Sequence, residues 1–172
     1  MTRIVCLTGA ESSGKTTLAE ALAEALEGVL VREVARELLV PGEAYDEEDV
    51  IRIAHHQVDA ENRALASTTG WVIADTDLKV IRIWMAERFG NWPAALAQRF
   101  AERPPRRYVL CAPDIPWQAD PLREHPADAD RVRLHALYQT LLAELDASWL
   151  EVSGGVETRL QAVLDWLPRQ AR

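Results

Sequence analysis

The residues best suited to chemistry lie near the start of the chain, where GAESSGKT fits the pattern Gly, four residues, Gly, Lys, Ser or Thr. Glycines let successive backbone N–H groups turn toward a phosphate, and a helix that follows adds its positive N-terminal end. We therefore predict a loop that cradles the phosphates of a nucleotide. The residues predicted to contact the nucleotide are Gly9, Glu11, Ser12, Ser13, Gly14, Lys15, Thr16 and Thr17.

Three side chains are expected to act on a triphosphate. Lys15 would bring an ammonium to the β and γ phosphates, and the hydroxyl of Thr16 would be a ligand of Mg²⁺. The chain's 19 basic residues include only two lysines, Lys15 and Lys79, so a compact ammonium stands where one is needed. Asp75 ends an apolar run and is expected to hold Mg²⁺ opposite Thr16, with a helix cap or a plain strand-end carboxylate as the alternative.

A second set of polar residues could hold the molecule that receives a phosphoryl group. Glu33 could take the proton of an acceptor hydroxyl or hydrogen-bond the acceptor's sugar, and Arg36 could fix a polar or anionic group. Either Glu33 or Asp75 could orient the attacking hydroxyl. The alternative is a surface ion pair between residues three apart. Asp77 shares a face with Asp75 if the chain stays extended, although it could instead cap the helix that starts near Leu78.

Residues 113–131 contain four prolines and no sustained periodicity, which predicts a loop and makes this segment the candidate lid. Arg123 and Arg131 could clamp the phosphoryl group as the lid excludes water, or could be solvated loop charges. Trp117 could stack on a ring or anchor the packing. The tryptophans Trp84, Trp92 and Trp166 are expected to pack.

The chemistry-bearing residues are separated by alternating strand and helix patterns. Strands are predicted at residues 3–8, 29–34, 71–74, 108–111 and 149–152. Helices are predicted at about 16–27, 46–66, 131–146 and 156–167, with another that contains residues 80–85. This alternation predicts an α/β fold, with one parallel sheet between helices and ligands at the carboxyl ends of the strands.

The composition narrows the class of protein. The 172 residues suit a single domain over 1–172, and 48% apolar with 27% charged residues is typical of a globular protein. No apolar run approaches the roughly 20 residues of a membrane span, and the N-terminus lacks the order of a secretory signal, so we expect a cytoplasmic protein without membrane contact. A net charge of -8 argues against nucleic acid as a partner. Cys6 and Cys111 are expected to be buried thiols, and a homodimer is compatible with the sequence.

Four segments together resemble a known family: GAESSGKTTL, REVAR, IADTD and PDIPWQADPLR. From about residue 3 to about residue 165 the chain is similar to the ribosylnicotinamide kinase domain of the bacterial multifunctional NAD biosynthesis regulator, a branch of the P-loop kinases. The resemblance implies a five-stranded parallel sheet in the order 2-3-1-4-5. It also implies that ATP phosphorylates the 5'-hydroxyl of nicotinamide riboside, giving nicotinamide mononucleotide.

The resemblance also carries roles to individual residues. It implies phosphate binding by Gly14, Lys15, Thr16 and Thr17, magnesium binding by Thr16 and Asp75, acceptor contacts by Glu33, Arg36 and Asp77, and lid functions for Asp120 and Arg123. Pro121 departs from the family, whose motif usually has Gly there, and should stiffen the lid. The chain has no room for the adenylyltransferase domain that precedes the kinase in the full regulator, so NAD synthesis and DNA repression are not expected. A P-loop ATPase or regulatory NTPase, or a kinase for another nucleoside or small acceptor, remains the alternative.

Overall fold

Five parallel strands form one sheet in the order β2-β3-β1-β4-β5, which confirms the predicted order. The computed structural model describes residues 3–120, 122–123, 127–145 and 147–168, so the prediction for Pro121 lies outside the described residues. The strands are β1 (Arg3–Thr8), β2 (Val29–Val31), β3 (Trp71–Asp75), β4 (Arg107–Cys111) and β5 (Trp149–Val152).

The central strand β1 pairs with β3 on one side and with β4 on the other. Its residues from Ile4 to Thr8 are all buried, as expected for a strand covered on both faces. The register sets Leu7 beside Asp75. The last residue of β3 therefore lies next to the point where β1 ends and the glycine-rich loop begins.

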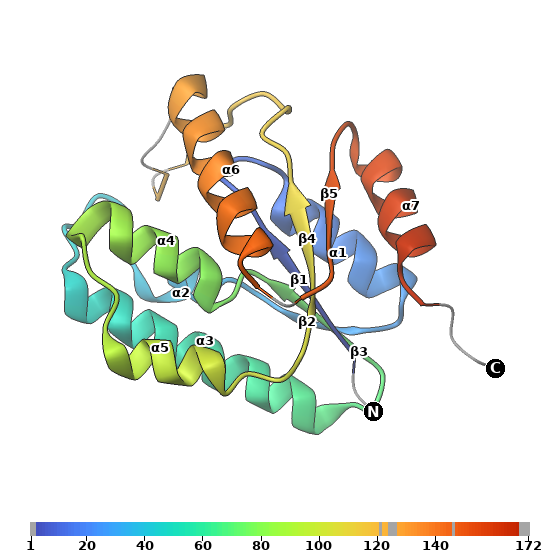
Figure 1. Ribbon diagram of the computed structural model, residues 1–172, viewed down its shortest axis with the longest axis horizontal. Coiled ribbons are helices and arrows are strands. Elements are labelled where there is room, and N and C mark those ends of the chain that lie inside the picture. Colours follow the sequence, from blue (N-terminus) through green and yellow to red (C-terminus); the bar gives the residue numbers. More distant parts are fainter. Residues whose placement is uncertain (1–2, 121, 124–126, 146, 169–172) are drawn as a thin grey trace.

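Helices cover both faces of the sheet, as Figure 1 shows. On one face, α1 (Lys15–Ala25) and α7 (Val156–Trp166) pack on side chains such as Val5, Leu7 and Ile73. On the other face, α6 (Asp128–Ala143) packs on Cys6, Val72 and Leu110, together with parts of α3 (Glu47–Ser67) and α4 (Leu78–Phe89). Neighbouring β1 residues thus bury opposite faces, as the strand period requires.

Two short helices lie beyond this second face. The elements α2 (Ala35–Leu38) and α5 (Ala94–Ala101) share an apolar cluster with α3 and α4. Neither helix was predicted. The cluster includes Val50, Ile53, Ile81, Met85 and Leu96, and it fixes α3 against α4 on the side of the sheet where β2 ends.

Three boundaries differ from the sequence predictions. Strand β2 ends at Val31 instead of Val34, because the chain turns away from the sheet into α2. Helix α6 begins at Asp128, inside the predicted lid of 113–131 and three residues before the predicted helix start at Arg131. Helix α3 begins one residue after the predicted Asp46, which caps it by accepting a hydrogen bond from the Asp49 N–H group.

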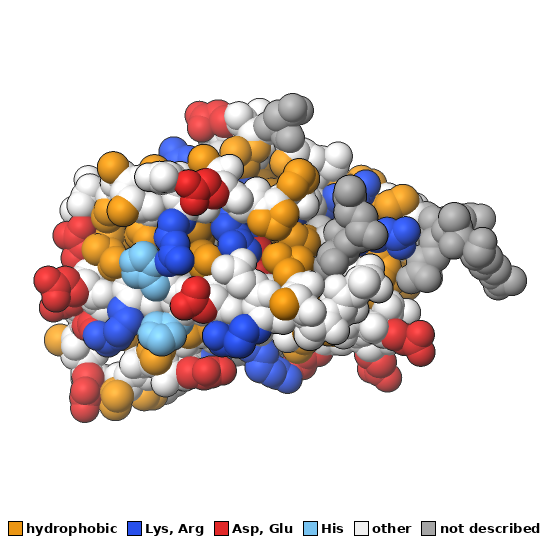
Figure 2. Space-filling view, turned by 90° about the horizontal axis from the view of Figure 1, so that it is seen from below, with side chains coloured by type: hydrophobic (Ala, Val, Ile, Leu, Met, Phe, Trp, Pro, Cys, Tyr) orange, Lys and Arg blue, Asp and Glu red, His pale blue; other side chains and the backbone are white. Residues whose placement is uncertain are grey.

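The surface carries charges of both signs. Figure 2 shows acidic and basic side chains interspersed with apolar ones over the face that it presents. Cys6 and Cys111 are both free and buried, as predicted. Among the described residues, the structure contains no helix with the length and apolar character needed to cross a lipid bilayer.

Candidate active site

The glycine-rich loop connects β1 to α1 at the carboxyl end of the sheet, where the motif requires it. Gly9 has φ +135°, and a Cβ added there would lie 2.7 Å from the carbonyl oxygen of Cys111. Only glycine allows β1 to leave the sheet this close to the end of β4. Gly14 has φ 80° and precedes α1 without offering a side-chain cap, so the N-terminal N–H groups of α1 remain available to a phosphate.

The ammonium of Lys15 lies inside the curve of this loop. It donates hydrogen bonds to the carbonyl oxygens of Gly9 at 3.0 Å and Ala10 at 2.8 Å. These neutral partners hold the charge at the mouth of the loop without cancelling it. An anionic phosphate can therefore replace them with a stronger, charge-assisted contact.

Two buried arginines support the loop from outside. Arg131 donates to the carbonyl oxygen of Ser12 at 3.1 Å, and Arg159 donates to that of Ser13 at 2.5 Å. Both side chains turn loop carbonyls outward, which is the arrangement needed for N–H groups to face inward. Arg131 itself lies in α6, is 2% exposed and also donates to the carbonyl of Ile115 in the predicted lid segment, so it lies beside that segment, and its action on a phosphoryl group stays a prediction.

Thr16 and Asp75 meet as predicted. The two side chains are hydrogen bonded, and Asp75 is 2% exposed. Burial raises the pKa of the Asp75 carboxyl, while the bond to Thr16 and the charge of Lys15 oppose that rise. A hydroxyl and a carboxylate beside a phosphate loop are the hard oxygen donors that Mg²⁺ prefers.

Glu33 and Arg36 lie across the cavity from the phosphate loop. Burial raises the pKa of Glu33, with Lys15 lowering it and Asp75 raising it, so these three groups share one electrostatic environment. The guanidinium of Arg36 binds the Glu33 carboxylate at 3.2 Å and the Asp120 carboxylate at 2.8 Å. The ion pair between Glu33 and Arg36 that was considered from the sequence is therefore present. Both residues line the cavity, and Arg36 also pairs with Asp120 of the lid segment.

The lid segment also contacts the phosphate loop. The hydroxyl of Ser12 accepts from the Gln118 N–H at 3.0 Å and from Arg123 at 3.4 Å. Trp117 lies on a separate cleft of about 460 Å³ beside Arg131, and its ring is 5.7 Å from the Arg123 guanidinium. The structure thus places Arg123 at the cavity and Trp117 outside it.

One cavity of about 830 Å³ is lined by the phosphate loop and by Glu33, Arg36 and Arg123. Its lining does not include Asp75 or Asp120, which contact the lining residues Thr16 and Arg36. The phosphate loop forms one end, and the other end is lined by side chains that follow β2 or belong to α4. Sequence reasoning missed most of this second end, because its residues fit no contiguous motif. The additional lining residues include Leu39, Tyr45, Ile83, Trp84, Glu87 and Arg88.

An aromatic pair shapes that second end. The Trp84 indole donates to the Tyr45 hydroxyl at 2.9 Å, and the two rings meet edge to face with centroids 5.3 Å apart. Arg88 lies over the Tyr45 ring at 5.5 Å. Trp84 packs, as predicted, against the apolar cluster of α3 and α4, but it also lines the cavity.

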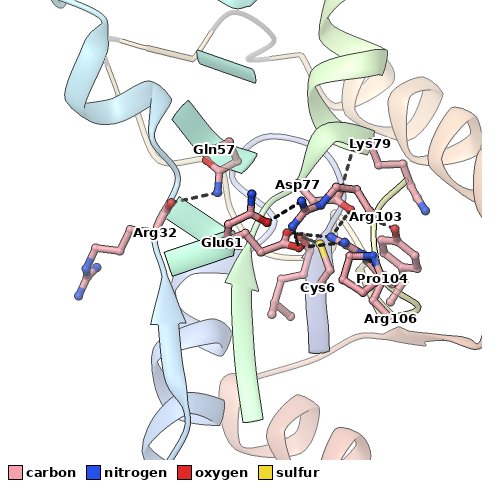
Figure 3. Close-up of polar contacts among 12 residues, drawn as sticks. Cys6, Arg32, Gln57, Glu61, Asp77, Lys79, Arg103, Pro104 and Arg106 are labelled. Carbon is pink, nitrogen blue, oxygen red and sulfur yellow. Dashed lines mark hydrogen bonds and ion pairs between the residues drawn. The ribbon is translucent and has the colours of Figure 1, made fainter. Parts of the chain in front are cut away.

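Asp77 lies outside the cavity, at the start of α4. It caps α4 by accepting from the Lys79 N–H at 2.9 Å, and it accepts from the Tyr108 hydroxyl at 3.0 Å. Arg106 pairs with it at 3.4 Å and with Glu61 at 2.8 Å (Figure 3). Asp77 therefore caps α4, which is the alternative considered from the sequence. It does not line the cavity, so its predicted contact with an acceptor is not supported by its position.

No group of three or more His, Cys, Asp or Glu side chains among the described residues could form a metal site alone.

A model for the family described as AAA domain matches residues 4–159, which is most of the chain. The chain belongs to this AAA domain family. Among curated proteins, none matches it by sequence.

Solved structures identify the fold further. A NadR protein in complex with NR superposes with a TM-score of 0.76 at 23% identity, covering 95% of this chain and 48% of that chain. A NadR protein in complex with NAD and AMP-PNP superposes with a TM-score of 0.76 at 23% identity, covering 99% of this chain and 52% of that chain. Thymidylate kinase from Ehrlichia chaffeensis gives 0.71 at 16% identity, covering 97% and 99%. The fold is thus that of the P-loop kinases, and the chain spans about half the length of the NadR chains.

Proposed function

We propose that this protein is an ATP-dependent kinase that phosphorylates the 5'-hydroxyl of a nucleoside, with nicotinamide riboside as the leading acceptor and nicotinamide mononucleotide as the product. The observation that carries the proposal is the continuous cavity of about 830 Å³, because it has a phosphate loop at one end and an aromatic, charged compartment at the other. A plain ATPase needs the first end only. Two compartments in one cavity suit a donor and an acceptor held together.

The donor half would bind the triphosphate through the loop from Gly9 to Thr16. Lys15 would leave the carbonyls of Gly9 and Ala10 and contact the β and γ phosphates, and Arg123 at the lid would add a second positive charge. Thr16 and Asp75 fit Mg²⁺ as a hydroxyl and a carboxylate already in contact. When bound, the ion supplies positive charge to the phosphate oxygens.

In the transfer step, the acceptor hydroxyl oxygen forms a bond to the γ-phosphorus as the bond to the β,γ-bridging oxygen breaks and ADP leaves. The hydroxyl proton passes to Glu33, whose raised pKa suits it to accept a proton in a site that excludes water. Arg36 holds the Glu33 carboxylate at 3.2 Å and connects it to Asp120 of the lid segment. Closing the lid would therefore orient the base as well as exclude water.

Nicotinamide riboside suits the acceptor half for two reasons. Its planar, cationic ring can lie against the aromatic pair of Tyr45 and Trp84. The carboxylate of Glu43 also lines this end of the cavity and puts a negative charge beside the ring. Glu87, another lining carboxylate, is instead paired with Arg133, and Arg88 lines the same end. The resemblance of the REVAR and IADTD segments to the ribosylnicotinamide kinase domain points to the same acceptor.

The test is to incubate the protein with Mg-ATP and a panel of nucleosides that includes nicotinamide riboside, and to identify phosphorylated products by mass. We expect ADP formation to depend on the acceptor and nicotinamide mononucleotide to form fastest. ADP released at the same rate with every acceptor and with none would show an ATPase instead. A faster product from another nucleoside would keep the kinase and replace the acceptor.

A further inference from the structure

The backbone on both sides of Glu33 is held by a side chain from another element. Strand β2 ends at Val31, so the backbone around Glu33 has no neighbouring strand to pair with. The side-chain amide of Gln57, from α3, supplies the missing pairing. Its oxygen accepts from the Val34 N–H at 2.9 Å, and its nitrogen donates to the Arg32 carbonyl at 3.2 Å.

These two hydrogen bonds lie on either side of one residue. Figure 3 shows the bond from Gln57 to Arg32. Together the two bonds fix the carbonyl before Glu33 and the N–H group after it, which constrains the backbone dihedral angles that aim its carboxylate. Gln57 is 2% exposed and Val34 is buried, so losing the pair would leave the buried Val34 N–H without a partner and would free the partly buried Arg32 carbonyl. The amide orientation is the one that matches each donor with an acceptor.

Helix α3 is itself fixed one turn further along. Glu61, four residues after Gln57, lies on the same helix face and is 3% exposed. It accepts from Arg106 at 2.8 and 2.9 Å and from Arg103, which joins α3 to the segment leading into β4 (Figure 3). Gln57 therefore projects from a helix that cannot slide along the sheet without breaking a buried ion pair.

We propose that Gln57 is a positioning residue for phosphoryl transfer, acting by fixing the backbone on both sides of Glu33. Because it concerns the transfer step, this role rests on the proposed function. We therefore expect replacing Gln57 to lower kcat only while the Glu33 carboxylate is present, and to leave the affinity for nucleotide unchanged. A residue that only stabilised α3 would show no such dependence on Glu33.

The decisive experiment is a double-mutant cycle with Gln57→Leu and Glu33→Gln. We expect Gln57→Leu to lower kcat about tenfold in the wild-type background and less than about twofold in the Glu33→Gln background, since the two residues act as a unit. Titration of Mg-AMP-PNP should give the same Kd for all four proteins. Equal losses of kcat in both backgrounds would overturn the proposal.

Val58→Ala is the matched control, because Val58 is a buried neighbour on α3 that contributes to the apolar cluster and has an apolar side chain, which cannot hydrogen-bond to the backbone of residues 32–34. Its effect on kcat should be the same in both backgrounds. Should Gln57→Leu fail to fold, Gln57→Glu can replace it in the cycle, because a carboxylate still accepts from Val34 but cannot donate to Arg32.

A second measurement separates this proposal from the proposed function. Hydrogen exchange of the Val34 amide should be at least about tenfold faster in Gln57→Leu than in the wild type, with exchange at Lys15 and Thr16 unchanged. If the wild type phosphorylates no nucleoside, the proposed function fails, and the exchange result still shows whether Gln57 fixes this backbone. Unchanged exchange at Val34 would contradict the proposal in either case.

Discussion

The two ends of the cavity are built in different ways. The phosphate end is one contiguous loop, in which backbone groups and a single ammonium line the cavity. The other end, which we call the acceptor end after its proposed function, is assembled from α2, the segment before α3, α4 and the lid segment, and its side chains line the cavity. A backbone site requires only that a few residues permit an unusual conformation, whereas a side-chain site requires that several helices be held at fixed positions.

The supporting contacts differ in the same way. Arg131 and Arg159 hold the phosphate loop through its carbonyl oxygens, so they stabilise a shape that the glycines already allow. The acceptor end depends on Gln57 and on the buried group formed by Glu61, Arg106 and Asp77. Changes at the phosphate end should therefore abolish chemistry directly, while many changes at the acceptor end should act through position or stability.

The largest expected effect comes from the two lysines, which offer a matched comparison. Lys15→Met should lower kcat/KM by about 10²–10³-fold, because it removes the only ammonium that the phosphate loop offers to the transferring group. Lys79→Met should stay within about threefold of the wild type, because Lys79 is fully buried away from the cavity. Steady-state kinetics with ATP and the acceptor measure both. A larger loss of kcat/KM in Lys79→Met would mean that a buried residue outside the cavity also affects catalysis.

Two aspartates two residues apart sharpen the comparison. Asp75→Asn should lower kcat about 10–100-fold and raise the Mg²⁺ concentration needed for half-maximal activity, since it removes a carboxylate in contact with Thr16. Asp77→Asn keeps a side chain that can cap α4 but loses the charge that faces Arg106, so it should cost about 1–3 kcal/mol of unfolding free energy. Kinetics and denaturant unfolding of both variants test this. If Asp77→Asn raised KM for the acceptor without loss of stability, Asp77 would belong to the acceptor site after all.

The pH dependence should report the shared electrostatic environment of the two ends. Burial raises the pKa of both Glu33 and Asp75, and both must be ionised to accept a proton or hold a metal. Activity should therefore fall, as pH is lowered, at a higher pH than ordinary carboxyl groups would give. The acid limb of kcat/KM in Glu33→Gln should lie at lower pH than in the wild type. An acid limb at the ordinary values of 4.5 and 3.8 would contradict this environment.

The sequence predicted the phosphate end well because its determinants are local. Glycines at special backbone angles, a lysine and a hydroxyl at fixed spacing, and a strand leading into a helix are all visible in one segment. The same holds for the five strands, whose apolar runs differ from the structure by at most a few residues. The end of β2 could not be predicted, because the apolar Val34 extends the strand pattern by three residues. In the structure the Val34 N–H bonds to the side chain of Gln57, on a distant helix, instead of to a neighbouring strand.

The acceptor end was predicted only in part because it depends on contacts between distant segments. Tyr45 lies in a polar loop and Trp84 in an apolar helix, and nothing local indicates that their rings meet. The sequence predicted Arg131 in or beside the lid, but it could not show that α6 buries this side chain against the carbonyl of Ser12. A signal was available for α5, since Pro93 immediately precedes it and proline favours helix starts.

The smallest expected effect concerns stability at the buried end of α4. Lys79 is fully buried, its ammonium lies 3.2 Å from the Tyr108 ring centroid and has no hydrogen-bond partner, and burial lowers its pKa from 10.5 to about 8. Between those values the unfolded chain binds a proton that the folded chain does not, so stability from this group rises with pH over that window.

Below about pH 8 both states are protonated and the folded state bears the full cost of the buried charge. Lys79→Met should therefore unfold with about 1–3 kcal/mol more free energy near neutral pH, and its advantage over the wild type should shrink as pH approaches 10.5. Denaturant unfolding of both proteins across this range measures the difference. A constant difference would mean that Lys79 contributes through packing on Tyr108 alone, and a destabilised variant would show that its charge balances Asp77.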